Sequence, residues 1–160
     1  MPNPSLRWPG PEYHVHVEFR APLPYVFSWC TDFDPHDDRR EKDRYTRKIV
    51  ERTPRRVVFE DLVDTDHGWT WARHVVTLHP PNWWHSDSVG SHRTVTLDYV
   101  LTRLGDERTR LDLRWRRRRT ALGSAKISRR AYEKATTQAW RNFARELEKD
   151  YRKSRARRRR

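Results

Sequence analysis

The sequence predicts an α+β domain in which an antiparallel sheet of about seven strands packs on one long C-terminal helix. Two observations lead to this prediction. The pattern of residues 44 to 119 is almost entirely typical of strands, and the turns between the strand-like segments are too short for crossover helices. After Gly123 the period of the apolar residues changes from two to about 3.6, which is the period of an amphipathic helix.

The size and composition of the chain fit one folded domain. The chain has 160 residues, with 34% hydrophobic and 36% charged residues, and its eight Trp, six Tyr and five Phe can hold a core. The single cysteine, Cys30, excludes an internal disulfide and fits a reducing compartment. Because no apolar run approaches ~20 residues and no signal pattern opens the chain, we expect a cytoplasmic protein. We expect it to be a monomer or a dimer.

The first strand and the first helix are predicted from residues 12 to 30. Residues 1 to 11 are rich in proline and are expected to form an irregular lead-in, so that the domain proper covers residues 12–151. Tyr13 to Phe19 alternate as a strand with one buried face does. Two prolines then fit the first turn of a short helix from Pro22 to Cys30, and one further helical turn is expected within residues 34–43.

Six more strands are predicted between Asp43 and Thr120, separated by proline, glycine, asparagine and aspartate at the turns. In the last two strands the apolar faces are clear and consist of Val95, Leu97, Tyr99 and Leu101, and of Leu111, Leu113 and Trp115. The six predicted strands are Tyr45–Arg52, Arg56–Asp64, Trp69–His79, Trp83–Ser88, His92–Arg103 and Arg108–Arg119.

The long helix is predicted from Ala125 to Tyr151, with Ser124 as its N-cap. Its inner face is expected to carry a row of apolar residues that recur every four positions, flanked by Tyr132 and Trp140: Ile127, Ala131, Ala135, Ala139, Phe143 and Leu147. Residues 152–160 form a basic tail, which we expect to be disordered and solvated. The alternative is a weak, nonspecific contact of this tail with nucleic acid, the ribosome or an anionic surface.

Two motifs resemble those of a known superfamily. The segment "VHVEFRAPLPYVFSWCTDFD" is similar to the opening motif of SRPBCC proteins, the START-like and polyketide-cyclase-like group, which have an alternating strand, Ala-Pro, a Val-aromatic pair and an Asp-hydrophobic turn. "VVTLHPPNWW" resembles the strand that ends in a proline-containing turn in the middle of their sheet. The resemblance covers about residues 12 to 150, and it departs from the family at the very polar segment "DPHDDRREKD".

This resemblance implies the helix-grip fold, in which a curved sheet wraps around the C-terminal helix and leaves a cavity. Members of the superfamily bind lipids, sterols, polyketides or other hydrophobic ligands there, and some catalyse cyclisation or dehydration. The residues expected to line such a cavity in this chain are Trp69, Trp71, Arg73, His74, Trp83, Tyr99, Trp115, Tyr132, Ala135 and Ala139.

Each cavity candidate also has a structural interpretation. The alanines indicate either free space or close packing of the helix on the sheet, and the tryptophans could simply form the core. His74 could transfer protons in the cavity or be a core histidine bound to a neighbouring carbonyl. Arg73 could meet an acidic ligand or pair with Asp98 or Glu60.

Three functions follow from these features. The first is a carrier or sensor of a small hydrophobic ligand. The second is a cyclase or dehydratase that uses His74, Arg73 and either Tyr99 or Tyr132. The third is a nucleic-acid- or ribosome-associated module that acts through the Arg-rich segments 116–119 and 152–160. The sequence favours the first function.

Catalytic, metal and cofactor signals are sparse in the sequence. His14 and His16 are spaced to chelate a metal, but no third ligand is evident, so we expect no metal site. With five glycines and no phosphate-binding loop, we expect no nucleotide and no other cofactor. Cys30 is expected to be inert packing, and no residue is assigned a catalytic role.

Overall fold

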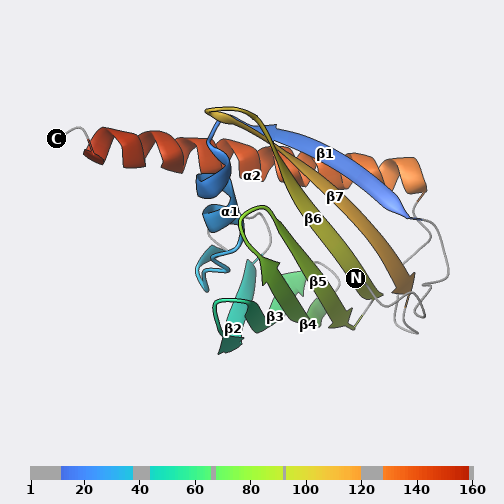
Figure 1. Cartoon of the computed structure of the whole chain (residues 1–160). Coiled ribbons are helices and arrows are strands. Elements are labelled where there is room, and N and C mark those ends of the chain that lie inside the picture. Colours follow the sequence, from blue (N-terminus) through green and yellow to red (C-terminus); the bar gives the residue numbers. More distant parts are fainter. Residues whose placement is uncertain (1–11, 38–43, 66–67, 92, 120–127, 159–160) are drawn as a thin grey trace.

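The computed structural model describes residues 12–37, 44–65, 68–91, 93–119 and 128–158 of the chain (Figure 1). Seven strands and two helices follow one another in the order that the sequence predicts. They are β1 (Tyr13–Phe19), α1 (Leu23–Cys30), β2 (Arg44–Arg52), β3 (Arg56–Thr65), β4 (Gly68–His79), β5 (Trp83–Gly90), β6 (Arg93–Gly105), β7 (Arg108–Arg119) and α2 (Arg129–Arg158).

All seven strands form one antiparallel sheet with the order β1-β7-β6-β5-β4-β3-β2. Strands β2 to β7 are a meander, and β1 pairs with the last strand, so that Val15 lies opposite Leu113 and Tyr13 opposite Trp115. Figure 1 shows α2 running along β1, while the sheet extends from β7 toward β2 away from the helix. The predicted α+β helix-grip architecture is confirmed.

The core lies where α1 and α2 meet the inner face of the sheet. Phe19, Leu101, Leu111 and Leu147 are fully buried there, together with Val26 of α1. The predicted faces of the last strands are confirmed, because Leu111, Leu113 and Trp115 are all buried. On β1 the apolar residues are likewise buried while the polar residues between them are exposed.

The predicted inner face of α2 is wrong over its first half. Ala131, Ala135 and Ala139 are exposed, and the face toward the sheet instead carries Tyr132, Trp140 and Ala144. Successive helical residues turn by about 100°, so a row of residues four apart drifts by about 40° at each step. Between Leu147 and Ala131 the accumulated drift is about 160°, which moves the alanines to the opposite side of the helix.

The ends of α2 also differ from the prediction. Ser128 caps the helix, since its Oγ accepts a hydrogen bond from the backbone N–H of Ala131 at 3.2 Å. The expected cap Ser124 lies outside the described residues, as do the lead-in 1–11 and most of segment 34–43. The tail was expected to be disordered, but α2 continues to Arg158, and Arg155 Nη1 donates to Glu107 Oε1 at 2.7 Å. Within the described part of the chain, no helix is long and apolar enough to cross a membrane.

Candidate functional site

A cavity of about 630 Å³ lies between the inner face of the sheet and α2. Trp71, near the start of β4, and Ser91, directly after β5, border it at one end. A smaller pocket of about 160 Å³ adjoins it toward α1, and the two share Phe33, Arg47, Trp84, Tyr99 and Trp140. Aromatic side chains make up much of the wall of the main cavity: Phe33, Phe59, Trp84, Tyr99, Trp115, Tyr132 and Trp140.

Cross-strand pairing holds these rings in place. Trp84 on β5 lies opposite Tyr99 on β6, and their rings stack at 4.8 Å with 10° between the planes. Trp115 stacks in the same way on Tyr13, at 5.1 Å, and Tyr132 of α2 packs edge-on against Tyr13. Directly opposed aromatic residues stabilise an antiparallel sheet, so the flat walls of the cavity are part of its framework.

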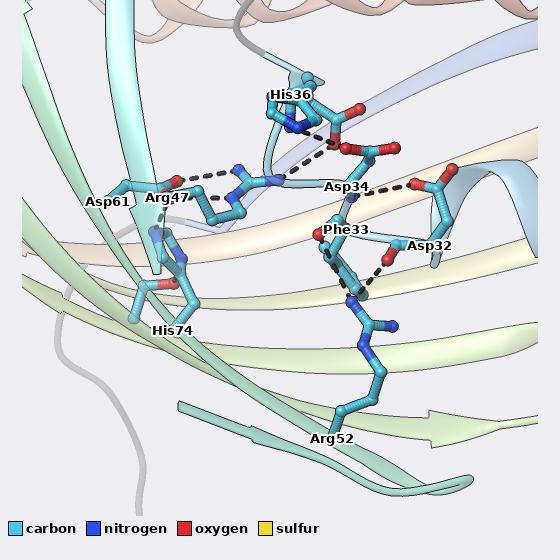
Figure 2. Close-up of polar contacts among 10 residues, drawn as sticks. Asp32, Phe33, Asp34, His36, Arg47, Arg52, Asp61 and His74 are labelled. Atoms are coloured by element: carbon cyan, nitrogen blue, oxygen red, sulfur yellow. Dashed lines mark hydrogen bonds and ion pairs between the residues drawn. The ribbon is translucent and has the colours of Figure 1, made fainter. Parts of the chain in front are cut away.

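A cluster of charged residues lies on the β2–β3 side of the cavity (Figure 2). Arg47 donates from Nε to Asp61 Oδ1 at 2.8 Å and from Nη2 to Asp61 Oδ2 at 2.9 Å. Its third nitrogen, Nη1, donates to Asp37 Oδ2 at 3.1 Å. Burial opposes the charge of Arg47, but the hydrogen bonds and the charge of Asp61 outweigh it and raise the pKa of the guanidinium. Arg47 therefore stays cationic and is neutralised by the two carboxylates.

His74 joins this cluster from β4. Its Nδ1 forms a hydrogen bond with Ser88 Oγ at 2.6 Å, and its Nε2 lies 3.7 Å from Asp61 Oδ2. The imidazole stacks on the ring of Phe59 at 4.6 Å, and the Arg47 guanidinium lies over that ring at 4.4 Å. These contacts fix the orientation of an imidazole that faces the cavity, where it can exchange a hydrogen bond or a proton with a bound molecule.

The turn after α1 forms part of the cavity rim. Phe33 has a φ of 46°, a left-handed conformation that costs ~1–2 kcal/mol for a residue other than glycine. Arg52 Nη2 donates to the carbonyl of Asp32 at 2.6 Å, and Asp34 Oδ1 accepts from His36 N at 2.7 Å (Figure 2). These hydrogen bonds hold the turn, and the Phe33 ring lies 5.1 Å from that of Phe59. The Asp-Phe-Asp-Pro segment thus places an aromatic side chain against the cavity.

Five of the ten predicted lining residues line the cavity, namely Trp71, His74, Tyr99, Trp115 and Tyr132. The other five lie away from it, and their prediction as lining residues is wrong. Trp69 is 61% exposed, Arg73 pairs with Glu60 outside the cavity at 3.3 Å, and Trp83 stacks on His79. Trp69 and Arg73 lie on the face of β4 that points away from the cavity, because Ala72 and His74 occupy the inner face, and Trp83 likewise lies on the face of β5 opposite to that of Trp84. Trp71 shares the outer face of β4 but still borders the cavity. Ala135 and Ala139 are exposed through the helical drift described above.

The predicted lining residues did not include Arg47, Asp61, Ser88 or Arg117, which all line the cavity. One signal for the first two was present. Arg47 lies between Tyr45 and Ile49 in the alternation of its strand, and Asp61 follows Phe59 in the same way, so each is a charge on an apolar face.

Three further residues considered in the sequence, Cys30, His14 and His16, lie outside the main cavity. Burial, with a smaller effect of the nearby Asp32 charge, raises the pKa of the Cys30 thiol, which therefore stays protonated. His14 and His16 are exposed, and His14 Nε2 lies 3.2 Å from Asp112 Oδ1. No group of three metal-binding side chains occurs among the described residues.

The outer face of the sheet holds a histidine between two carboxylates. His85 Nδ1 lies 2.7 Å from Asp98 Oδ1, and its Nε2 lies 3.1 Å from Asp87 Oδ1. The hydrogen bond to Asp98 raises the pKa of His85, although partial burial opposes this. These three residues do not line the cavity, so we expect their interactions to affect the stability of the fold.

Solved structures of other proteins share this architecture. No protein-family model and no curated protein matches the sequence. Among solved structures, TTHA0849 from Thermus thermophilus is 16% identical over 87% of this chain and 95% of its own, at a TM-score of 0.68.

Two other matches are a START superfamily protein and a cyclase. The START superfamily protein from Mycobacterium smegmatis is 16% identical over 88% of this chain and 97% of its own, at a TM-score of 0.63. The Zhui aromatase/cyclase from a Streptomyces species is 17% identical over 86% of this chain and 88% of its own, at a TM-score of 0.61. At these identities the likeness concerns the fold, and the chain has the helix-grip fold of START-like proteins.

Proposed function

We propose that the chain binds a small hydrophobic ligand with a flat ring system, as a carrier or sensor. The observation that carries this proposal is the cavity of about 630 Å³ between the sheet and α2, walled by aromatic rings. Its volume falls within the ~300–1,000 Å³ of small-molecule sites. Because Trp84 with Tyr99 and Trp115 with Tyr13 are held parallel in pairs, the walls favour planar or aliphatic ligands over compact polar ones.

The polar groups of the cavity further limit which chemical classes of ligand would fit. The Arg47 guanidinium uses all three of its nitrogens on Asp61 and Asp37, so it has little capacity left for a ligand. His74 and Ser88 lie on the adjoining strands and present groups that can donate or accept. A ligand with a carbonyl or hydroxyl oxygen near these two residues would fit the site.

A cyclase or dehydratase is the second candidate, and the position of His74 favours it. A general acid–base needs an imidazole within hydrogen-bond reach of the reacting group, and His74 lines the cavity beside Ser88 and Asp61. Tyr99 and Tyr132 also line the cavity, whereas Arg73, included in the sequence-based hypothesis, lies outside it. In this candidate the substrate would be a linear, poly-carbonyl molecule of the size of the cavity.

A binding titration with one blocking variant tests the proposal. N-phenyl-1-naphthylamine is an uncharged, flat probe whose fluorescence rises in apolar surroundings. We expect the parent protein to bind it and Thr136→Trp to bind at least about tenfold more weakly, because Thr136 lines the cavity and the indole would fill it. Ala135→Trp is the matched control, since its side chain lies on the exposed side of the same helix. Equal binding by all three proteins, or none by the parent, would contradict the proposal.

A second assay separates the enzyme from the carrier. If His74 transfers protons, His74→Gln should slow cyclisation of a poly-β-keto thioester by about 10²–10⁴-fold and leave probe binding within about threefold. If the parent protein binds the probe and leaves the thioester unchanged, the carrier or sensor function stands alone.

A further inference from the structure

Two arginines line the cavity, and they differ in how their charges are compensated. Arg47 is bound by Asp61 and Asp37, as described above. Arg117, on β7, makes no ion pair with any carboxylate of the described residues. Its guanidinium instead lies over aromatic rings, 4.2 Å from the centre of Tyr132 and 5.8 Å from that of Tyr13.

The described carboxylates on the neighbouring elements are engaged elsewhere. Glu12 pairs with Arg116, at 3.4 Å. Glu133 of α2 accepts from the backbone N–H of His14 at 3.1 Å and from Arg129 at 3.4 Å. Arg47 is balanced by Asp61 and Asp37, so Arg117 is the lining guanidinium that pairs with no carboxylate among the described residues.

The strand register places Arg117 at a defined distance from the polar cluster. His74, Ser88, Val95 and Arg117 are paired successively across β4, β5, β6 and β7. Three strand spacings of about 4.8 Å separate His74 from Arg117, which is no more than about 14 Å along a curved sheet. The rings of Tyr99 and Trp115 lie on the strands between and beside these groups.

We infer that the ligand is an amphipathic acid, and that Arg117 binds its anionic group at the wall of the cavity. This inference rests on the proposed function. A guanidinium binds carboxylate, sulfonate or phosphate oxygens in a bidentate manner, and the Tyr132 ring shields one face of it from water. The ligand has its anion at Arg117, its flat apolar body against Tyr99 and Trp115, and a neutral oxygen toward His74 and Ser88.

A pair of probes with the same rings tests the inference. 8-Anilino-1-naphthalenesulfonate carries a sulfonate, and N-phenyl-1-naphthylamine is the same ring system without it. We expect Arg117→Gln to weaken binding of the sulfonate at least about tenfold, as loss of a hydrogen bond to a charged group does, and to change binding of the neutral probe less than twofold. Arg116→Gln is the matched control, because the adjacent residue already pairs with Glu12 and does not line the cavity.

The outcomes separate the inference from the proposed function. If the parent protein binds the neutral probe and Arg117→Gln leaves the ratio of the two affinities unchanged, the inference is overturned and ligand binding stands. If the parent protein binds neither probe, both are overturned. Should Arg117→Gln not fold, displacement of the neutral probe from the parent protein decides. 2-Naphthoate displacing it more strongly than 2-naphthamide supports the inference, and equal or weaker displacement overturns it.

Discussion

Replacing Asp61 with alanine should strongly destabilise the fold, because Arg47 would remain buried with only Asp37 to balance its charge. The side chains of Arg47 and Asp61 are 10% and 12% exposed, so water can replace little of what is lost. Breaking such a buried pair from one side costs about 3–5 kcal/mol of unfolding free energy. The loss of two charge-assisted hydrogen bonds, at ~1.5–3 kcal/mol each, agrees with this range.

Urea and thermal denaturation measure this effect. In a domain of this size each kcal/mol lowers the Tm by about 2–4 °C, so Asp61→Ala should melt about 6–20 °C below the parent protein. Glu60→Ala is the matched control. It removes the neighbouring carboxylate, which pairs with Arg73 at the surface, and should cost less than about 1 kcal/mol.

The double variant Arg47→Leu, Asp61→Leu shows whether Asp61→Ala is destabilised by a buried, poorly compensated charge or by lost packing. With both charges removed, we expect it to be at least about 2 kcal/mol more stable than Asp61→Ala. If Asp61→Ala unfolded like Glu60→Ala, or if the double variant were less stable than Asp61→Ala, our account of the cluster would be refuted.

Three other perturbations give separate outcomes. Trp115→Ala should cost about 3–5 kcal/mol of unfolding free energy in urea, because the ring is 3% exposed; an unchanged Tm would contradict its place in the core. Because the pKa of His85 is raised in the folded state, protonated His85 stabilises the fold. This stabilisation is fully present below the ordinary histidine pKa of 6.5. Stability should therefore fall as the pH rises through the folded-state pKa, and His85→Gln should flatten this slope in urea titrations between pH 5 and pH 9. Deleting residues 152–160 should leave the Tm nearly unchanged, since Arg155 contributes only an exposed ion pair, and should weaken any binding to nucleic acid at low salt. A large drop in Tm on deletion would show that the tail supports the fold.

The strands could be predicted from the sequence because each depends on local signals. Leu111, Leu113 and Trp115 alternate with charged residues, and turn residues mark each end of the strand, so the buried face is determined without knowledge of its partners. The side of α2 that packs on the sheet could not be predicted from local signals in the same way. A row that begins correctly at Leu147 reaches the exposed Ala131, because a spacing of four residues is longer than one turn.

The site was only partly predictable for a different reason. The inward position of His74 follows from the alternation of its own strand. The pairing of Arg47 with Asp61 depends on the register between two strands, and a bulge between Ile49 and Glu51 shifts that register. Which charges meet inside the cavity is therefore a property of the assembled sheet.

Native mass spectrometry of the protein, purified without detergent from cells that express it, tests the central claim most directly. We expect the parent protein and Ala135→Trp to carry a small organic acid with a flat ring system, which collisional activation releases. Thr136→Trp, whose indole would occupy the cavity, should be recovered without it. A bare parent protein that also fails to take up added flat acids, or equal ligand on all three proteins, would contradict the claim that this cavity binds the ligand.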